Sequence, residues 1–151
     1  MTTINKNEAL KRLTSLENEA KELRNIINAP VKITDRIKTF SDVLAVAGRK
    51  KEEFEEMPGE TADECAYRKL KLIAEVYNEG EVLDSMNTNQ YKYYPYFKIV
   101  PSGFGLSYFN YDGWTSYSSV GVRLCFKSSE LAIDAGKKFT DIYATFLINK
   151  Q

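Results

Sequence analysis

The sequence contains no histidine, the residue that most often serves as a general base in enzymes. Mechanisms of the Ser-His-Asp and Cys-His type are therefore excluded. Its two cysteines, Cys65 and Cys125, lie far apart without a CxxC spacing, so we expect two buried thiols rather than a zinc site. Phosphate-binding glycine loops, dinucleotide fingerprints and nucleophile-elbow motifs are also lacking. The sequence favours binding over catalysis and predicts no catalytic residue, metal or cofactor, with an enzyme acting through Asp112 or Lys127 left as an alternative.

Long apolar runs and net charge are equally lacking. No stretch approaches the roughly 18 apolar residues of a membrane span, and the start MTTINKNEALKR has no apolar signal-peptide core, so we expect a cytoplasmic protein without membrane contact. The formal net charge is zero, which gives no argument for non-specific attraction to nucleic acid. The sum hides a local contrast: residues 61–90 are acidic, whereas residues 91–127 are basic.

The first part of the chain has the pattern of an amphipathic helix. From about Asn5 to Asn28 the apolar residues alternate spacings of four and three, as in a coiled-coil seam. Three heptads with two alanines are too weak to be stable as an isolated dimer, and we expect the helix to pair either with the chain's own domain or with another copy. Pro30 ends it, which predicts a helix at 1–29 and a single domain at 30–151. The seam consists of Ala9, Leu13, Leu16, Ala20, Leu23 and Ile27.

Helix signals recur in the domain. Threonine followed by an acid three residues later begins two helices, one at Thr39 that Gly48 closes and one at Thr61 that continues to Gly80. Between them, the run RKKEEFEEMPGE has charge without apolar periodicity and predicts a solvated linker or mobile loop. A last helix with a broad apolar face extends from Ser128 or Ser129 to about Ile148.

An aromatic tract lies before this last helix and predicts strands at roughly 91–100, 103–111 and 119–126. Strands grouped between helices indicate the α+β class, with a small antiparallel sheet of three or more strands packed against the helices. Alternation along 91–99 and 120–127 separates an apolar face from an outward face of tyrosine, lysine and arginine. We expect the apolar face to meet the helices.

The outward face is the candidate ligand surface. Aromatic rings stack on nucleobases and basic side chains bind phosphates, which suits a small nucleotide or single-stranded nucleic acid. Such residues are also common on the solvent side of any sheet, Trp114 also fits a core anchor, and an acid of the protein could neutralise Arg123. For that acid we expect Asp112 or a residue of 61–90. The candidate ligand-binding residues are Tyr94, Tyr96, Lys98, Trp114, Arg123 and Lys127.

Three segments carry a resemblance: AYRKLKLIAEVYNEGEVLD, NQYKYYPYF and GVRLCFKSSELAIDAGKKF. In order, they resemble a group of small uncharacterised proteins from Bacteroidetes genomes, prophages and phages, with KYYPWF and SRLCFKS-ELA-type motifs, over roughly 37–147. The chain departs from that pattern where Glu81, Ser85 and Tyr96 replace tryptophans. The resemblance implies a phage-associated accessory role in a bacterial host rather than a reaction.

These observations lead to one expected function and two alternatives. We expect a non-enzymatic, phage-associated accessory protein, a homo-oligomer that binds a small nucleotide-type ligand, such as a host-defence signalling nucleotide, at the aromatic and basic face. The first alternative is a module that binds single-stranded nucleic acid in an open groove. The second is a structural or interaction protein that oligomerises through the N-terminal helix.

Overall fold

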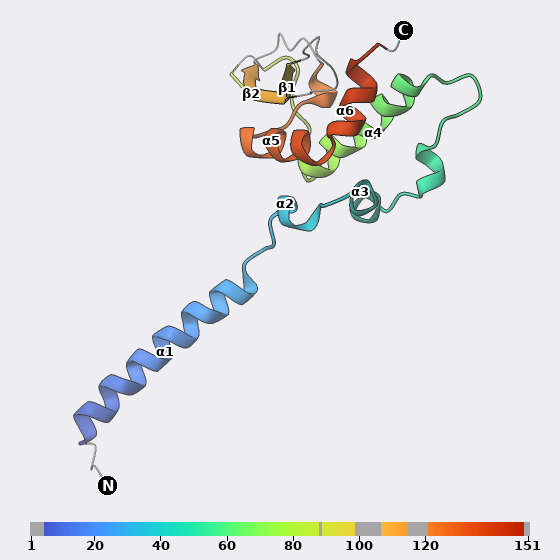
Figure 1. Cartoon of the computed structure of the whole chain (residues 1–151). Helices are drawn as coiled ribbons and strands as arrows, with labels where there is room; N and C mark the ends of the chain where they lie inside the picture. The colour runs from blue at the N-terminus through green and yellow to red at the C-terminus, as the bar shows by residue number, and fades with distance from the viewer. Residues whose placement is uncertain (1–4, 88, 99–106, 115–120, 150–151) are drawn as a thin grey trace. The chain divides into compact units, whose positions relative to one another are not determined.

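The computed structural model describes residues 5–87, 89–98, 107–114 and 121–149, with only the backbone at Lys98 and across 107–114. The chain divides into two compact units, Met1–Lys32 and Ile33–Gln151 (Figure 1). The first holds α1 (Lys6–Asn28). In the second, the described elements are α2 (Ile33–Arg36), α3 (Phe40–Ala47), the 3-10 helix η1 (Lys51–Phe54), α4 (Ala62–Tyr77), β1 (Lys92–Lys98), β2 (Ser107–Trp114), the 3-10 helix η2 (Val122–Leu124), α5 (Ser129–Lys138) and α6 (Thr140–Leu147).

The predicted α+β class is wrong, because the described residues are mostly helical and their extended structure is confined to the antiparallel pair β1 and β2. In place of the predicted strand 119–126, residues Val122–Leu124 form a 3-10 turn, and residues 115–120 lie outside the described part of the chain. Phe126 makes a single bridge to Tyr93. The predicted sheet of three or more strands is therefore absent from the described residues.

A buried amide binds the backbone that directly follows this turn. The Asn78 side chain, at the end of α4, donates from Nδ2 to the Cys125 carbonyl at 2.9 Å and accepts at Oδ1 from the Lys127 amide at 2.8 Å. Backbone polar groups that are buried need partners, and here a side chain supplies two of them instead of a neighbouring strand. Tertiary contact with α4 thus replaces the sheet ladder.

Helix α4 is central to the core of the second unit. The Thr61 amide donates to the Glu64 carboxylate at 2.8 Å and fixes its start, as the sequence predicts. The helix packs on α3, α5, α6 and η2. Because other elements cover α4 on several sides, its buried residues are not confined to a single stripe along the helix. They are Cys65, Ala66, Leu70, Leu72, Ile73, Ala74, Val76 and Tyr77.

The predicted C-terminal helix is divided into α5 and α6. Phe139 leaves helical geometry with φ −114° and ψ 28°, and its side chain is buried in the core. At the break, Thr140 Oγ1 donates to the Gly136 carbonyl at 2.8 Å. Gly136 also lets the hairpin approach α5, because a Cβ at this position would lie 2.8 Å from Pro95 Cβ. The hairpin and α5 lie side by side in Figure 1.

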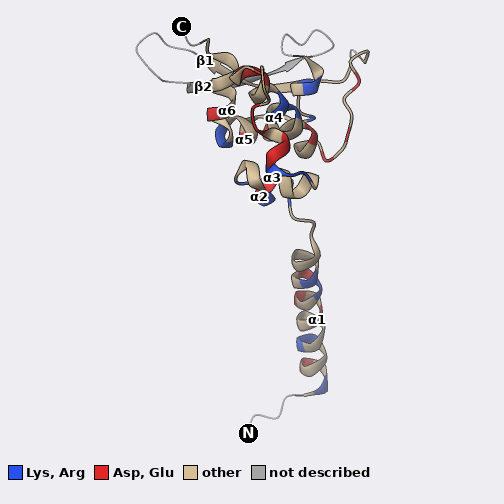
Figure 2. Ribbon diagram, turned by 90° about the vertical axis from the view of Figure 1, so that its right-hand side faces the viewer, with Lys and Arg blue, Asp and Glu red and all other residues tan. Residues whose placement is uncertain are grey.

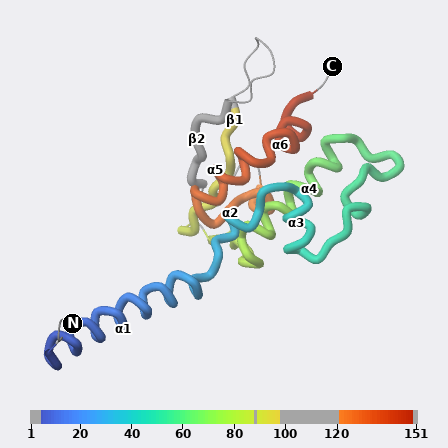
Figure 3. The backbone as a smooth tube through the Cα atoms, turned by 60° about the horizontal axis from the view of Figure 1, so that its bottom comes forward, coloured from blue at the N-terminus to red at the C-terminus, as the bar shows by residue number. Residues whose placement is uncertain are grey.

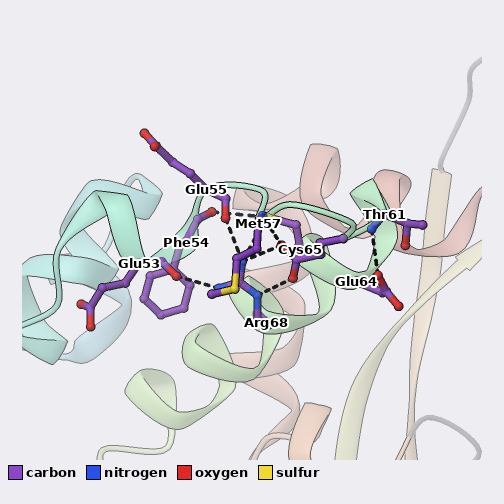
Figure 4. Close-up of polar contacts among 9 residues, drawn as sticks. Glu53, Phe54, Glu55, Met57, Thr61, Glu64, Cys65 and Arg68 are labelled. Atoms are coloured by element: carbon purple, nitrogen blue, oxygen red, sulfur yellow. Dashed lines mark hydrogen bonds and ion pairs between the residues drawn. The ribbon is translucent and has the colours of Figure 1, made fainter.

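The segment 49–60, predicted as a solvated linker or mobile loop, is tied to α4. The Arg68 guanidinium donates to the carbonyls of Glu53 and Glu55 at 2.6 and 2.8 Å, and to both carboxylate oxygens of Glu60 (Figure 4). Phe54 is buried beneath this cluster. The segment is mostly exposed, as predicted, but its contacts with α4 come from a residue of the next helix and are not visible in the segment's own sequence. Figure 3 shows the segment as the cyan and green path between α3 and α4.

In the first unit, α1 begins at Asn5, whose Oδ1 accepts a hydrogen bond from the Glu8 amide at 2.9 Å. No residue of α1 is buried. Among the described residues, no helix combines the length and the apolar character that crossing a membrane requires.

Candidate functional site

The predicted outward face of the aromatic tract is not formed by simple alternation along β1. Lys92 is fully buried, and its Nζ donates to the carbonyls of Asn87 and Gln90 at 3.1 and 3.0 Å. Tyr94 is buried in a small cluster with Leu83 and Cys125. Phe97 is buried as well, in the main core. Strand β1 is covered on two sides, which is why a single polar face does not follow from its sequence.

The remaining residues predicted on the hairpin do not form one site. Tyr96 is exposed. Lys98 is paired in register with Ser107, whereas Trp114 is paired with Lys92, so these two candidates lie at opposite ends of the hairpin. Six residues of strand separate these ends, or about 20 Å at the usual rise. The backbone therefore keeps Lys98 and Trp114 apart, and their side chains lie outside the described atoms.

Arg123 and Lys127 have different surroundings. Arg123 is exposed on the 3-10 turn η2, not in the middle of a strand as predicted. Lys127 Nζ lies 3.7 Å from Glu79 Oε1 and 3.5 Å from Glu81 Oε2, just after α4. An acid of the 61–90 segment thus pairs with Lys127, whereas for Arg123 we had expected either Asp112 or such an acid. The side chain of Asp112 lies outside the described atoms.

A cluster of tyrosine, aspartate and lysine joins α4 to α5. Tyr77 Oη donates to Asp134 Oδ2 at 2.8 Å, and Lys138 Nζ donates to the same oxygen at 2.7 Å and to the Thr34 carbonyl at 2.6 Å. Burial, followed by the bond to Asp134, raises the pKa of Tyr77 far above its usual value. The phenol therefore stays protonated and works as a structural donor. The cluster joins α4 to α5 and to the backbone of α2.

None of the residues predicted to bind a ligand lines the cavity between α4 and α6 or belongs to a metal site among the described residues. A cavity of about 450 Å³ lies between the start of α4 and the end of α6, lined by Ala62, Asp63 and residues 145–149. In the described part of the chain, no three Cys, Asp or Glu side chains gather in a way that could hold a metal ion. Both cysteines are buried and reduced, as predicted.

Helix α1 presents a row of exposed apolar side chains at the seam predicted from the sequence. Leu13, Leu16 and Leu23 of the predicted seam are 53, 56 and 53% exposed, and Ile27 is 78% exposed. These side chains recur on one face of a helix of 23 residues. Leu10 and Ile26, which the seam prediction did not include, flank it and are also exposed. Both residues could have been found from the sequence by assigning heptad positions to the residues beside the seam.

No protein-family model, curated protein or solved structure matches this chain. The resemblance to the phage and prophage group, and the nucleotide-type ligand of the aromatic face, stay predictions.

Proposed function

We propose that the protein is an assembly module, in which α1 pairs with α1 of a second copy and brings two copies of the C-terminal unit together. One observation carries this proposal. An unbroken helix of 23 residues displays a seam of leucine and isoleucine at coiled-coil spacing, and none of its residues is buried. A seam of this kind is stabilised when another helix covers it.

The physical argument rests on where helix stability comes from. Starting a helix in water is costly, and most helical stability in proteins comes from packing of the apolar face. Two alanines in the seam, Ala9 and Ala20, reduce the area that a partner can cover. The expected result is reversible association that depends on concentration, rather than a permanent dimer.

The charges of α1 suit a second copy of the same helix. Figure 2 shows basic and acidic residues interspersed along α1, not separated into a basic and an acidic half. Two copies of α1 can therefore approach each other without a large repulsion between regions of like charge. The basic residues are Lys6, Lys11, Arg12, Lys21 and Arg24, and the acidic ones are Glu8, Glu17, Glu19 and Glu22.

The proposal is tested by sedimentation velocity over a concentration series. In the double variant Leu16→Lys/Leu23→Lys, two charges enter the seam, and we expect a monomer at concentrations where the unaltered chain associates. Asn18→Lys/Asn25→Lys adds the same charge on the opposite face of the helix and should leave association unchanged. Circular dichroism of both variants checks that the C-terminal unit remains folded. A monomeric unaltered chain at every concentration would refute the proposal.

A further inference from the structure

We infer that two copies of α1 pair in parallel and in register, and that four charged residues beside the seam set this orientation. The inference rests on the proposed self-association and specifies its geometry. The seam fixes the heptad register, because each spacing of three or four places the next apolar residue at an alternate core position. Core positions a are Lys6, Leu13, Ala20 and Ile27, and core positions d are Ala9, Leu16 and Leu23.

This register places four charges next to the core. Arg12 and Glu19 occupy g positions, and Glu17 and Arg24 occupy e positions. All four are exposed, and none forms an ion pair with another described residue. Their charges are therefore available to a partner helix.

A parallel pair brings unlike charges together. In that arrangement, a g residue of one helix faces the e residue of the following heptad in the other helix. Arg12 then faces Glu17 of the second copy, and Glu19 faces Arg24 of the second copy. Two-fold symmetry repeats both contacts on the other side of the seam. On each side, the charges of one helix therefore face opposite charges of the other.

In the antiparallel register that pairs all six seam residues, like charges come together. When Leu13 is opposite Leu23 and Leu16 is opposite Ala20, positions g face g and positions e face e. Glu17 then meets Glu17 of the second copy, and Glu19 meets its own counterpart. The two arginines instead face apolar side chains, Ile26 and Leu10. Because charges of one sign oppose each other here, the antiparallel arrangement is disfavoured.

The core residues indicate two strands rather than three or four. Leucine fills the d positions at Leu16 and Leu23, and a β-branched residue fills an a position at Ile27. Leucine at d with isoleucine at a favours dimers, and a single lysine at an a position, here Lys6, also specifies the oligomeric state, whereas Leu13 and Ala20 at the other a positions add no preference.

Cysteine cross-linking of the full chain distinguishes the two orientations. In the parallel pair, position 20 faces itself, so Ala20→Cys alone should form a disulfide-linked dimer under mild oxidation. In the antiparallel pair, position 20 faces position 16, so cross-links should require a mixture of Ala20→Cys and Leu16→Cys. Cys65 and Cys125 are buried, and the unaltered chain measures the background of cross-linking that these two cysteines give. Asn18→Cys, on the outer face, measures random collision.

The outcomes separate this inference from the proposed self-association. Cross-linking of Ala20→Cys well above the Asn18→Cys level supports the parallel pair. Association in sedimentation combined with cross-linking only in the mixture overturns the orientation but leaves the self-association intact. Association without a cross-link above the Asn18→Cys level also overturns the orientation. A chain that sediments as a monomer overturns both.

Charge reversal provides a second measurement. In the parallel pair, Glu17→Arg places two arginines opposite each other at two symmetric positions and should raise the dissociation constant about tenfold. Adding Arg12→Glu to that variant restores unlike charges and should return the constant to near its original value. In an antiparallel pair, Glu17→Arg only exchanges one like-charge contact for another, and the second change restores nothing. Equal constants for all three chains would contradict the parallel arrangement.

Discussion

Replacing Leu16 by alanine is expected to weaken self-association by roughly 30- to 150-fold. The side chain is 56% exposed in the single chain, so about half of its burial remains to be gained on pairing. Full burial of a leucine contributes about 1.5–3 kcal/mol, which leaves roughly 1–1.5 kcal/mol per copy. A symmetric pair contains two copies, and a loss of about 2–3 kcal/mol corresponds to the stated change in the dissociation constant.

Alanine makes the comparison clean, because it is the best helix former and does not weaken α1 itself. The matched control is Asn18→Ala, which makes the same kind of change on the outer face of the helix and should leave the dissociation constant unaltered. Sedimentation velocity at concentrations on either side of the constant measures both variants.

Two results would refute the reasoning. If Leu16→Ala and Asn18→Ala have the same dissociation constant, the seam is not the contact surface. If Leu16→Ala loses association together with helical signal in circular dichroism, while Asn18→Ala loses neither, the change acts on the helix and not on the interface.

Three further predictions concern the C-terminal unit. Gly136→Ala gains about 1 kcal/mol of helix propensity but loses about 1–3 kcal/mol through the 2.8 Å approach to Pro95, so the urea midpoint should fall; a rise would contradict the close packing. Hydrogen bonds from Arg68 lower the pKa of Glu60 from 4.5 to about 2, so this carboxylate stabilises the fold above pH 4.5 and progressively less as the pH falls toward 2. Urea midpoints should therefore fall more steeply over that interval in the unaltered chain than in Glu60→Gln, and parallel curves would contradict this assignment. If the predicted ligand surface binds a nucleotide, a thermal-shift screen of nucleotides and short oligonucleotides should find a stabilising compound whose effect Arg123→Ala reduces, and a screen without any shift would count against that surface.

Helix starts and stops could be predicted from the sequence because the groups that fix them are neighbours in the chain. Asp42 accepts hydrogen bonds from the amides of Lys38 and Thr39 at 2.9 and 2.8 Å. Gly48 takes the left-handed conformation, with φ 66°, at the end of α3. Each interaction spans four residues or fewer, so the residues that specify it are visible in a short window of sequence.

The aromatic tract was predicted less well. Alternation of apolar and polar residues identifies the buried face of a strand only when one face is covered and the other is exposed. In the structure, Tyr94 packs with Leu83 and Cys125, whereas Phe97 packs in the main core, so both faces of β1 are covered. The burial of Lys92 depends on carbonyl groups of the preceding loop. None of these neighbours can be identified from the spacing of the tract itself. The ligand surface was predicted from that spacing, so its prediction lacked the same information.

By itself, the sequence determined the helices with local caps, the apolar seam of α1 and the absence of histidine chemistry, because each depends on residue type and spacing along the chain. Tertiary structure decided the helical turn at Val122–Leu124, the ordered segment 49–60 and the break at Phe139. Distant side chains supply hydrogen bonds in the first two: Asn78 binds the backbone just after the turn, and Arg68 binds the backbone of segment 49–60. Backbone groups take whichever partner the folded chain brings within reach, and that partner is not encoded in the local pattern.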